Sequence, residues 1–141
     1  MFKKILVGYD GSKGSKVALR RALVTAGEYQ SEITALWVRE PLPRHSDLPG
    51  ECQGEAEAAD EYFKERHKEV TAMAEERGVA IRCETRQGHA AKMLLKVAEE
   101  GGYDLIVIGH SDHSELWGRM LGDTADRIAD HASCSVLIVK N

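Results

Sequence analysis

The chain has 141 residues and a formal net charge of −4 at pH 7, with 43% hydrophobic and 30% charged residues. This length suits one domain built around one hydrophobic core, so we expect a single domain over residues 1–141. The slightly acidic balance argues against nucleic acid as a general partner, because binding to a polyanion relies on excess positive charge.

The cysteines and the apolar segments narrow the setting of the protein. Cys52, Cys83 and Cys134 are odd in number and widely spaced, with no CxxC pair, so neither a disulfide framework nor a zinc site is expected. A reducing cytoplasm fits this pattern. The apolar run after Lys4 breaks too early for a signal peptide, and no segment approaches the roughly 18 apolar residues of a transmembrane helix. We therefore expect no membrane anchor.

Short β-rich apolar runs alternate with longer stretches of helical period. In chain order the sequence predicts strand 5–9, helix 15–26, strand 33–38, helix 56–77, strand 79–85, helix 90–100, strand 105–108, helix 124–132 and strand 135–139. This alternation is typical of a parallel sheet, and strands that are apolar on both sides indicate helices on both faces. We therefore predict an α/β fold with an open five-stranded parallel sheet.

Glycine and proline mark the expected ends of these elements. Gly27, Gly78 and Gly101 each follow a helical stretch, where a residue in the left-handed conformation commonly ends a helix. The segment 39–54 holds all three prolines and shows no periodicity, so it is predicted to be a long surface loop.

Two glycine-rich segments follow the first and the fourth strand. One runs from Gly8 to Gly14, and the other begins at Gly109 and reaches Gly122 before the last helix. In open parallel sheets, ligands bind beyond the carboxyl ends of the strands, where the strand order reverses. Two such exits therefore predict the strand order 3-2-1-4-5, with a crevice between the first and the fourth strand.

The start of the last helix, at residues 122–125, is the expected seat for a phosphate, because free backbone N–H groups and the helix dipole attract anions. A nucleotide is therefore the first ligand to consider. The glycine spacing matches neither GxxxxGK[ST] nor GxGxxG, so the interpretation of the same glycines as plain turn residues stays open.

Three segments carry a resemblance to a known family: VGYDGS at 7–12, DLIVIG at 104–109 and ADHASCSVLIVK at 129–140. Together with the order of the elements, they resemble the universal stress protein family over about residues 3–140. The resemblance implies the adenine nucleotide α-hydrolase-like fold, with five parallel strands and four helices. It also implies a homodimer that forms through the last strand.

Members of that family that bind ATP share a G-x2-G-x9-G-[S/T] pattern around the phosphates and the ribose. Gly109 and Gly122 match its first and third glycines at the right spacing. Asp112 replaces the second glycine, and Asp123 replaces the hydroxyl residue, with Thr124 following one place late. The resemblance therefore supports the location of the site more strongly than its occupancy.

The resemblance also assigns Asp10 and Val38 to contacts with the adenine or the ribose, although Val38 is equally well interpreted as core. The residues predicted to bind an adenine nucleotide, ATP or AMP, are Gly8, Tyr9, Asp10, Val38, Ile108, Gly109, Ser111, Asp112, Gly122, Asp123, Thr124 and Ala125.

The two aspartates oppose phosphate binding, because a carboxylate at contact distance from a phosphate oxygen costs about 1 kcal/mol in water and about 4 kcal/mol at an effective dielectric near 20. Three interpretations stay open. In the first, the Asp123 side chain caps the last helix and itself occupies the predicted phosphate site. Mg²⁺ bridges Asp112 or Asp123 to the bound nucleotide. Lys13 and Arg119 act as counter-charges for the phosphates.

Chemistry beyond binding is not expected from this sequence. His110 and His113 bracket Asp112, but no third ligand is evident, so we predict no resident metal site. No residue pair supplies an activated nucleophile or a general base. Any ATPase activity would be slow and would rest on Asp10 or on a metal held by Asp112.

The last strand is expected at an edge of the sheet, where Val136, Leu137, Ile138 and Val139 expose backbone groups that can pair with a second copy. The alternative is that this edge stays single.

Taken together, these features predict a regulatory protein of the stress response that senses ATP or AMP in the crevice between the first and fourth strands. One alternative is a dimeric adaptor that has lost nucleotide binding because of Asp112 and Asp123. A slow, metal-dependent ATPase is another. The sequence does not identify the protein partner.

Overall fold

The structure, a computed structural model, describes residues 1–39, 49–110 and 123–140, without the side chains of residues 49–59 and 123. Within this part of the chain, the strands are β1 (Lys4–Gly8), β2 (Glu32–Arg39), β3 (Arg82–Gln87), β4 (Leu105–Gly109) and β5 (Ser135–Val139). The helices are α1 (Lys13–Tyr29), α2 (Pro49–Glu76), α3 (Ala90–Gly101) and α5 (Asp123–His131).

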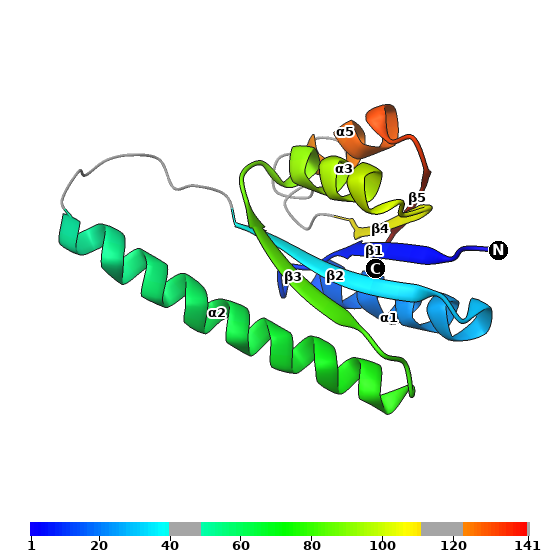
Figure 1. Ribbon diagram of the computed structural model, residues 1–141, viewed down its shortest axis with the longest axis horizontal. Coiled ribbons are helices and arrows are strands. Elements are labelled where there is room, and N and C mark those ends of the chain that lie inside the picture. Colours follow the sequence, from blue (N-terminus) through cyan, green and yellow to red (C-terminus); the bar gives the residue numbers. More distant parts are fainter. Residues whose placement is uncertain (40–48, 111–122, 141) are drawn as a thin grey trace.

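The five strands form one sheet in the order β3-β2-β1-β4-β5, and every neighbouring pair is parallel. This confirms the predicted fold class and strand order. Helices α1 and α2 cover one face of the sheet, and α3 and α5 cover the other (Figure 1). From β1 the chain adds β2 and β3 on one side of the sheet, and it then crosses over to add β4 and β5 on the other side. The order in which strands are added therefore reverses between β1 and β4.

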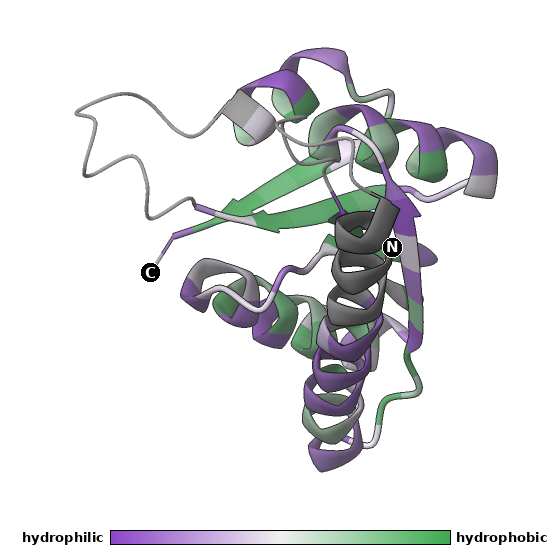
Figure 2. Ribbon diagram, turned by 90° about the vertical axis from the view of Figure 1, so that its left-hand side faces the viewer, coloured by the Kyte–Doolittle hydropathy of each residue, from purple (hydrophilic) through white to green (hydrophobic). Residues whose placement is uncertain are grey.

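The core is divided by the sheet into two apolar layers, because successive side chains of a strand point to opposite faces. Ile5 and Val7 pack toward α1 and α2, whereas Leu6 packs toward α3 and α5. All three are fully buried. Figure 2 shows the apolar strands of the sheet between helices whose outer faces are polar.

Two predicted helix ends are wrong by a few residues. Helix α1 continues through Gly27 to Tyr29, and Gln30 takes the left-handed conformation with φ 53°. Helix α3 includes Gly101 as its last residue, and Gly102 is left-handed at φ 70°. Gly78, with φ 66°, follows α2 as expected. Glycine signals a helix end well, but α1 ends only at Gln30, whose left-handed conformation lets its backbone N–H donate to the Ala26 carbonyl as a C-cap.

The predicted loop 39–54 is also wrong in its second half, because α2 begins at Pro49. Proline is well tolerated in the first turn of a helix, where its missing N–H needs no partner. The structure does not describe residues 40–48. In the part of the chain that it does describe, no helix is long and apolar enough to cross a membrane.

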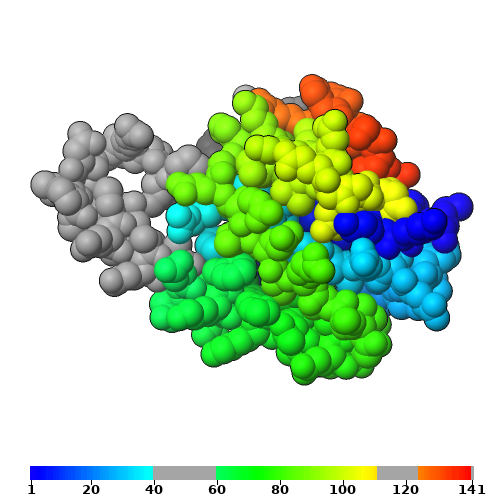
Figure 3. Space-filling model, viewed as in Figure 1, coloured from blue at the N-terminus to red at the C-terminus, as the bar shows by residue number. Residues whose placement is uncertain are grey.

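The third strand begins at Arg82 rather than at residue 79. Val79 and Ile81 belong to the connection after α2 and are partly buried against the α1 and α2 side of the core, so their apolar character reflects packing outside the strand. Strand β3 itself is polar, as is common for the edge of a sheet. It lies beside α2 at the surface of the molecule (Figure 3).

Candidate functional site

A cleft of about 590 Å³ lies at the carboxyl ends of β1, β2 and β4. Its position is the one that the reversal of strand order between β1 and β4 predicts. The predicted residues that line it are Gly8, Tyr9, Asp10, Val38, Ile108, Gly109 and Thr124. Four segments that are distant in sequence therefore meet around one volume, and ligand binding there stays a prediction.

The other predicted residues lie elsewhere or outside the described residues. Ala125 is 4% exposed and packs in the core beside α3, so it does not line the cleft. Lys13 is the exposed first residue of α1 and does not line it either. Asp123 is the first residue of α5, so the prediction that its side chain caps the helix stays untested. Residues that lie entirely outside the description are Ser111, Asp112, Arg119 and Gly122.

Two glycines allow the start of α1 to approach the end of β4 very closely. A Cβ atom added to Gly14 would lie 2.5 Å from the carbonyl oxygen of His110, and one added to Gly109 would collide with the Gly14 carbonyl group. The backbone N–H of His110 donates to Val139 at 2.8 Å, which fixes the end of β4 against β5. At these two positions, glycine serves contact between backbones in the wall of the cleft.

The turn between β1 and α1 presents polar groups to the cleft. The backbone N–H of Ser12 donates to the carboxylate of Asp10 at 2.9 Å. The Ser12 side chain caps α1 by accepting from the N–H of Ser15 at 3.2 Å. Gly11 has φ 85°, a conformation that other residues rarely adopt. The turn thus holds the Asp10 carboxylate at the mouth of the cleft.

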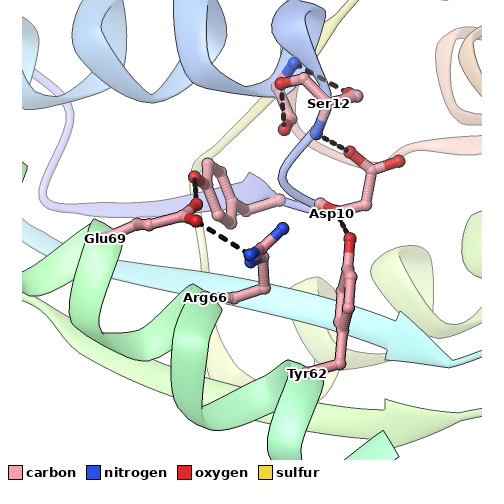
Figure 4. A network of polar contacts seen from close by, with 7 residues as sticks. Asp10, Ser12, Tyr62, Arg66 and Glu69 are labelled. Atoms are coloured by element: carbon pink, nitrogen blue, oxygen red, sulfur yellow. Dashed lines mark hydrogen bonds and ion pairs between the residues drawn. The ribbon is translucent and has the colours of Figure 1, made fainter.

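Helix α2 contacts the opposite side of this turn through a connected polar network (Figure 4). The hydroxyl of Tyr9 donates to Glu69 at 2.7 Å, and Glu69 pairs with Arg66 at 2.9 Å. The Arg66 guanidinium lies 4.4 Å from the centre of the Tyr62 ring, and the Tyr62 hydroxyl donates to the backbone carbonyl of Asp10. Burial, followed by the hydrogen bond to Glu69, raises the pKa of Tyr9 well above its usual value.

An aromatic group stands between α2 and the end of β2. The ring centres of Trp37 and Tyr62 are 4.9 Å apart, and those of Trp37 and Phe63 are 6.1 Å apart in a stacked arrangement. Trp37 also lines the cleft. Tyr62 is 38% exposed because it stands at the rim of the cleft beside Asp10.

A family model described as the universal stress protein family matches residues 1–140 of the chain. The chain belongs to the universal stress protein family. A universal stress protein of Methanocaldococcus jannaschii is 37% identical to it over 142 residues, which cover 99% of this chain and 83% of that protein. The universal stress protein YxiE of Bacillus subtilis is 35% identical over 148 residues, which cover 99% of this chain and all of that protein.

Two solved structures resemble the fold of this chain as well. A universal stress protein in complex with cAMP superposes with a TM-score of 0.75 at 25% identity, covering 98% of this chain and 97% of that one. The hypothetical protein MJ0577 superposes with a TM-score of 0.87 at 23% identity, covering 100% and 97% of the two chains. The second likeness shows the fold alone.

Several residues that line the cleft of this universal stress protein were not predicted from the sequence. They are Ser12, Ser15, Leu36, Trp37, Arg39, Ala90, Leu94 and His110. A signal was present for some of them, because Trp37 and Arg39 flank Val38 at a strand end, and Ser12 precedes a helical run as an N-cap. Ala90 and Leu94 come from α3, and the position of this helix beside the cleft depends on how it packs against the sheet and α5.

The cleft of this universal stress protein offers binding groups. Among the described residues, no three His, Cys, Asp or Glu side chains are grouped so as to hold a metal ion. Burial raises the pKa of the Cys83 thiol to about 11, and burial also raises the pKa of Cys134, so both thiols stay protonated at neutral pH.

The cleft itself is suited to hold an anionic small molecule between helix N-termini and apolar strand ends.

Proposed function

We propose that this universal stress protein binds an adenine nucleotide, ATP or AMP, in the cleft between β1 and β4, and that its output is regulatory. The observation that carries the proposal is the cleft of about 590 Å³ at the switch in strand order. This volume lies in the range of about 300–1,000 Å³ that is usual for small-molecule sites.

The residues around the cleft fit the three parts of a nucleotide. Leu36, Val38 and Ile108 supply an apolar surface that suits a base. The carboxylate of Asp10 suits the hydroxyl groups of a ribose, since a carboxylate accepts hydrogen bonds. The first turn of α5, with Thr124 in the cleft, suits a phosphate.

A relative supports the class of ligand. The solved universal stress protein in complex with cAMP is 25% identical to this chain over nearly its whole length. An adenine nucleotide is therefore the first ligand to test.

Two alternatives attach to the same cleft. A dimeric adaptor without nucleotide would follow if Asp112 and Asp123 exclude phosphates. A slow ATPase would require Mg²⁺ with the nucleotide, held by one of these aspartates and the phosphates. Co-purified nucleotide favours the sensor, a stable dimer without nucleotide favours the adaptor, and magnesium-dependent release of phosphate favours the ATPase.

We further propose that the protein forms a homodimer through β5 and acts in the cytoplasm. We also propose that this homodimer binds a further, unidentified protein partner. Strand β5 is one of the two edge strands of the sheet, and Leu137 is 38% exposed on it. Such an edge offers unpaired backbone groups to a second copy. The free thiols of Cys83 and Cys134 suit a reducing compartment.

The test is isothermal titration of the dialysed protein with AMP and with ATP, each with and without Mg²⁺. The wild type is expected to bind AMP at micromolar concentration. Val38→Trp, which fills the apolar part of the cleft, is expected to weaken AMP binding by about tenfold or more, a change of about 1.4 kcal/mol.

Val24→Trp is the matched control, because Val24 is a 41% exposed valine on α1 that does not line the cleft. It should leave AMP affinity unchanged. Absence of binding by the wild type would overturn the proposal, and equal loss in the two variants would remove the cleft as the site.

A further inference from the structure

One face of α2 holds the turn that carries Asp10. Tyr62, Arg66 and Glu69 follow one another at intervals of four and three residues, so they share one side of the helix. This side faces the exit of β1 (Figure 4). Glu69 accepts a hydrogen bond from Tyr9, and Tyr62 donates one to the carbonyl of Asp10. Two consecutive residues of the exit are thereby tied to points two helical turns apart.

Arg66 links these two attachments and contacts the turn directly. It pairs with Glu69 at 2.9 Å and lies over the Tyr62 ring at 4.4 Å. A Cβ atom added to Gly11 would lie 2.5 Å from Arg66 Nη1 and 2.7 Å from its Cδ. The Arg66 side chain therefore lies against the backbone of Gly11, and any larger residue there would have to displace it.

The same turn faces the cleft on its other side. Asp10 and Ser12 line the cleft, whereas Tyr62 and Arg66 do not. Asp10 is exposed at the surface, and apart from its own bond with the Ser12 N–H, its position depends on the backbone that carries it. A small movement of that backbone would move the carboxylate relative to Val38 and Ile108, which line the cleft from the strands on either side of β1.

We infer that Tyr62 and Arg66 are positioning residues, which hold the Asp10–Ser12 turn from behind and so couple α2 to occupancy of the cleft. This inference rests on the proposed nucleotide site. Coupling between two sites is reciprocal. A ligand that engages Asp10 therefore stabilises the contact of α2 with the turn, and loosening of α2 weakens binding of that ligand.

The coupling gives the fold a route by which binding reaches the surface. Tyr62 is 38% exposed, and α2 contacts the rest of the protein through β2, β3 and α1. The outer side of α2 in the described residues is polar and exposed. A change in how firmly α2 is held is thus available to a protein partner on the outer side of this helix, which does not line the cleft.

The test compares Tyr62→Phe with the wild type by titration with AMP and by hydrogen exchange. The substitution removes one hydroxyl and keeps the ring over which Arg66 lies. AMP affinity is expected to fall about threefold to tenfold, which is the effect of one net hydrogen bond. In the wild type, AMP should slow amide exchange in residues 60–76, and in Tyr62→Phe this slowing should be largely lost.

Tyr29→Phe is the matched control, because Tyr29 is an exposed tyrosine at the far end of α1, where it contacts Phe2. It should change neither AMP affinity nor the protection of α2. The urea midpoints of both variants should stay close to that of the wild type, which separates positioning from a general loss of stability.

Two further outcomes separate this inference from the proposed nucleotide site. If the wild type binds no AMP, the nucleotide proposal fails, while exchange in the ligand-free protein still tests the contact: the amides of Ser12 and Ser15 should exchange faster in Tyr62→Phe. If Tyr62→Phe binds AMP as tightly as the wild type, or if AMP protects α2 equally in both, the coupling is overturned.

Discussion

The two ends of the sheet carry cavities of similar size and different chemistry. The cleft at the carboxyl ends of the strands has about 590 Å³, and the cavity at the amino ends, between the C-termini of α1 and α2, has about 510 Å³. Volume alone does not distinguish a ligand-binding site from a hollow in the surface. The chemical groups that line the two cavities distinguish them.

The helices present opposite ends to the two cavities. Ser15 of α1, Ala90 of α3 and Thr124 of α5 all belong to first helical turns, and all line the carboxyl-end cleft. The amino-end cavity is lined by Gln30 and Gly78, which follow the last turns of α1 and α2. Helix N-termini carry partial positive charge and C-termini partial negative charge, so an anion favours the first cavity.

Polar groups at the amino end are also engaged with one another. The carboxylate of Asp104 accepts from the backbone N–H groups of Lys3 at 2.9 Å and Lys4 at 3.1 Å. The buried hydroxyl of Tyr103 donates to Thr34 at 2.8 Å. These contacts join the starts of strands and serve stability. Helix polarity and the availability of polar groups, rather than volume, therefore favour the carboxyl end as the proposed ligand site.

The largest expected effect is on stability, and it differs between glycines at the two ends of the sheet. Gly109→Ala drives a methyl group into the Gly14 backbone, and we expect it to lower the free energy of unfolding by about 3 kcal/mol or more. Gly102→Ala at the amino end has open space and only an unfavourable φ of 70°, so about 1 kcal/mol is expected. Urea unfolding measures both, and equal losses would contradict the difference in packing.

A smaller effect sharpens the electrostatic contrast. Replacing Asp112 and Asp123 together by Gly and Ser restores the pattern of the ATP-binding members, and it is expected to raise ATP affinity by at least about tenfold by removing two repulsive charges. Asp130→Ser removes an exposed charge near the other end of α5 and should have little effect. Isothermal titration without Mg²⁺ makes the comparison. Unchanged affinity would show that neither aspartate opposes the phosphates.

The smallest expected effect concerns the amino end. Burial tends to raise the pKa of Asp104, but the N–H groups of Lys3 and Lys4 outweigh it and hold that pKa below its usual value. Its charge therefore stabilises the fold above about pH 4, and this stabilisation is lost as the pH falls through the lowered pKa. Asp104→Asn should cost about 1 kcal/mol at pH 7 and less at pH 3.

Urea unfolding at the two pH values tests this prediction, with exposed Asp60→Asn as the control. A cost that does not depend on pH would mean that the shape of Asp104, and not its charge, matters. AMP affinity should be unchanged in Asp104→Asn, because the residue lies at the end of the sheet opposite the cleft.

Much of the fold was predictable because hydrophobic period is a local signal. The apolar runs that became β1, β4 and β5 needed at most one residue of correction, since strands buried under helices are apolar throughout. Strand β3 was misplaced because it is polar, while its apolar neighbours Val79 and Ile81 pack against the core from a connection. An edge strand gives a weaker pattern than a central one.

The candidate site was predictable in its location and only partly in its composition. Gly8, Asp10 and Gly109 follow strands directly, so their place at the carboxyl edge follows from the strand order. Leu94 lines the same cleft from helix α3, and no local sequence pattern predicts how close this helix lies to β1. The contact of Tyr62 with Asp10 joins residues 52 positions apart and has no local signature at all.

The amino-acid sequence alone accounts for the alternation of strands and helices and for the parallel sheet, and it predicts the end of that sheet at which a ligand would bind. These follow from the chemistry of neighbouring residues and from the polarity that parallel crossovers impose on their helices. The contact between Gly14 and Gly109, and the position of Tyr62 and Arg66 behind Asp10, are visible only in the folded protein. Such contacts depend on how separate helices pack against the sheet, where small differences in position decide which side chains touch.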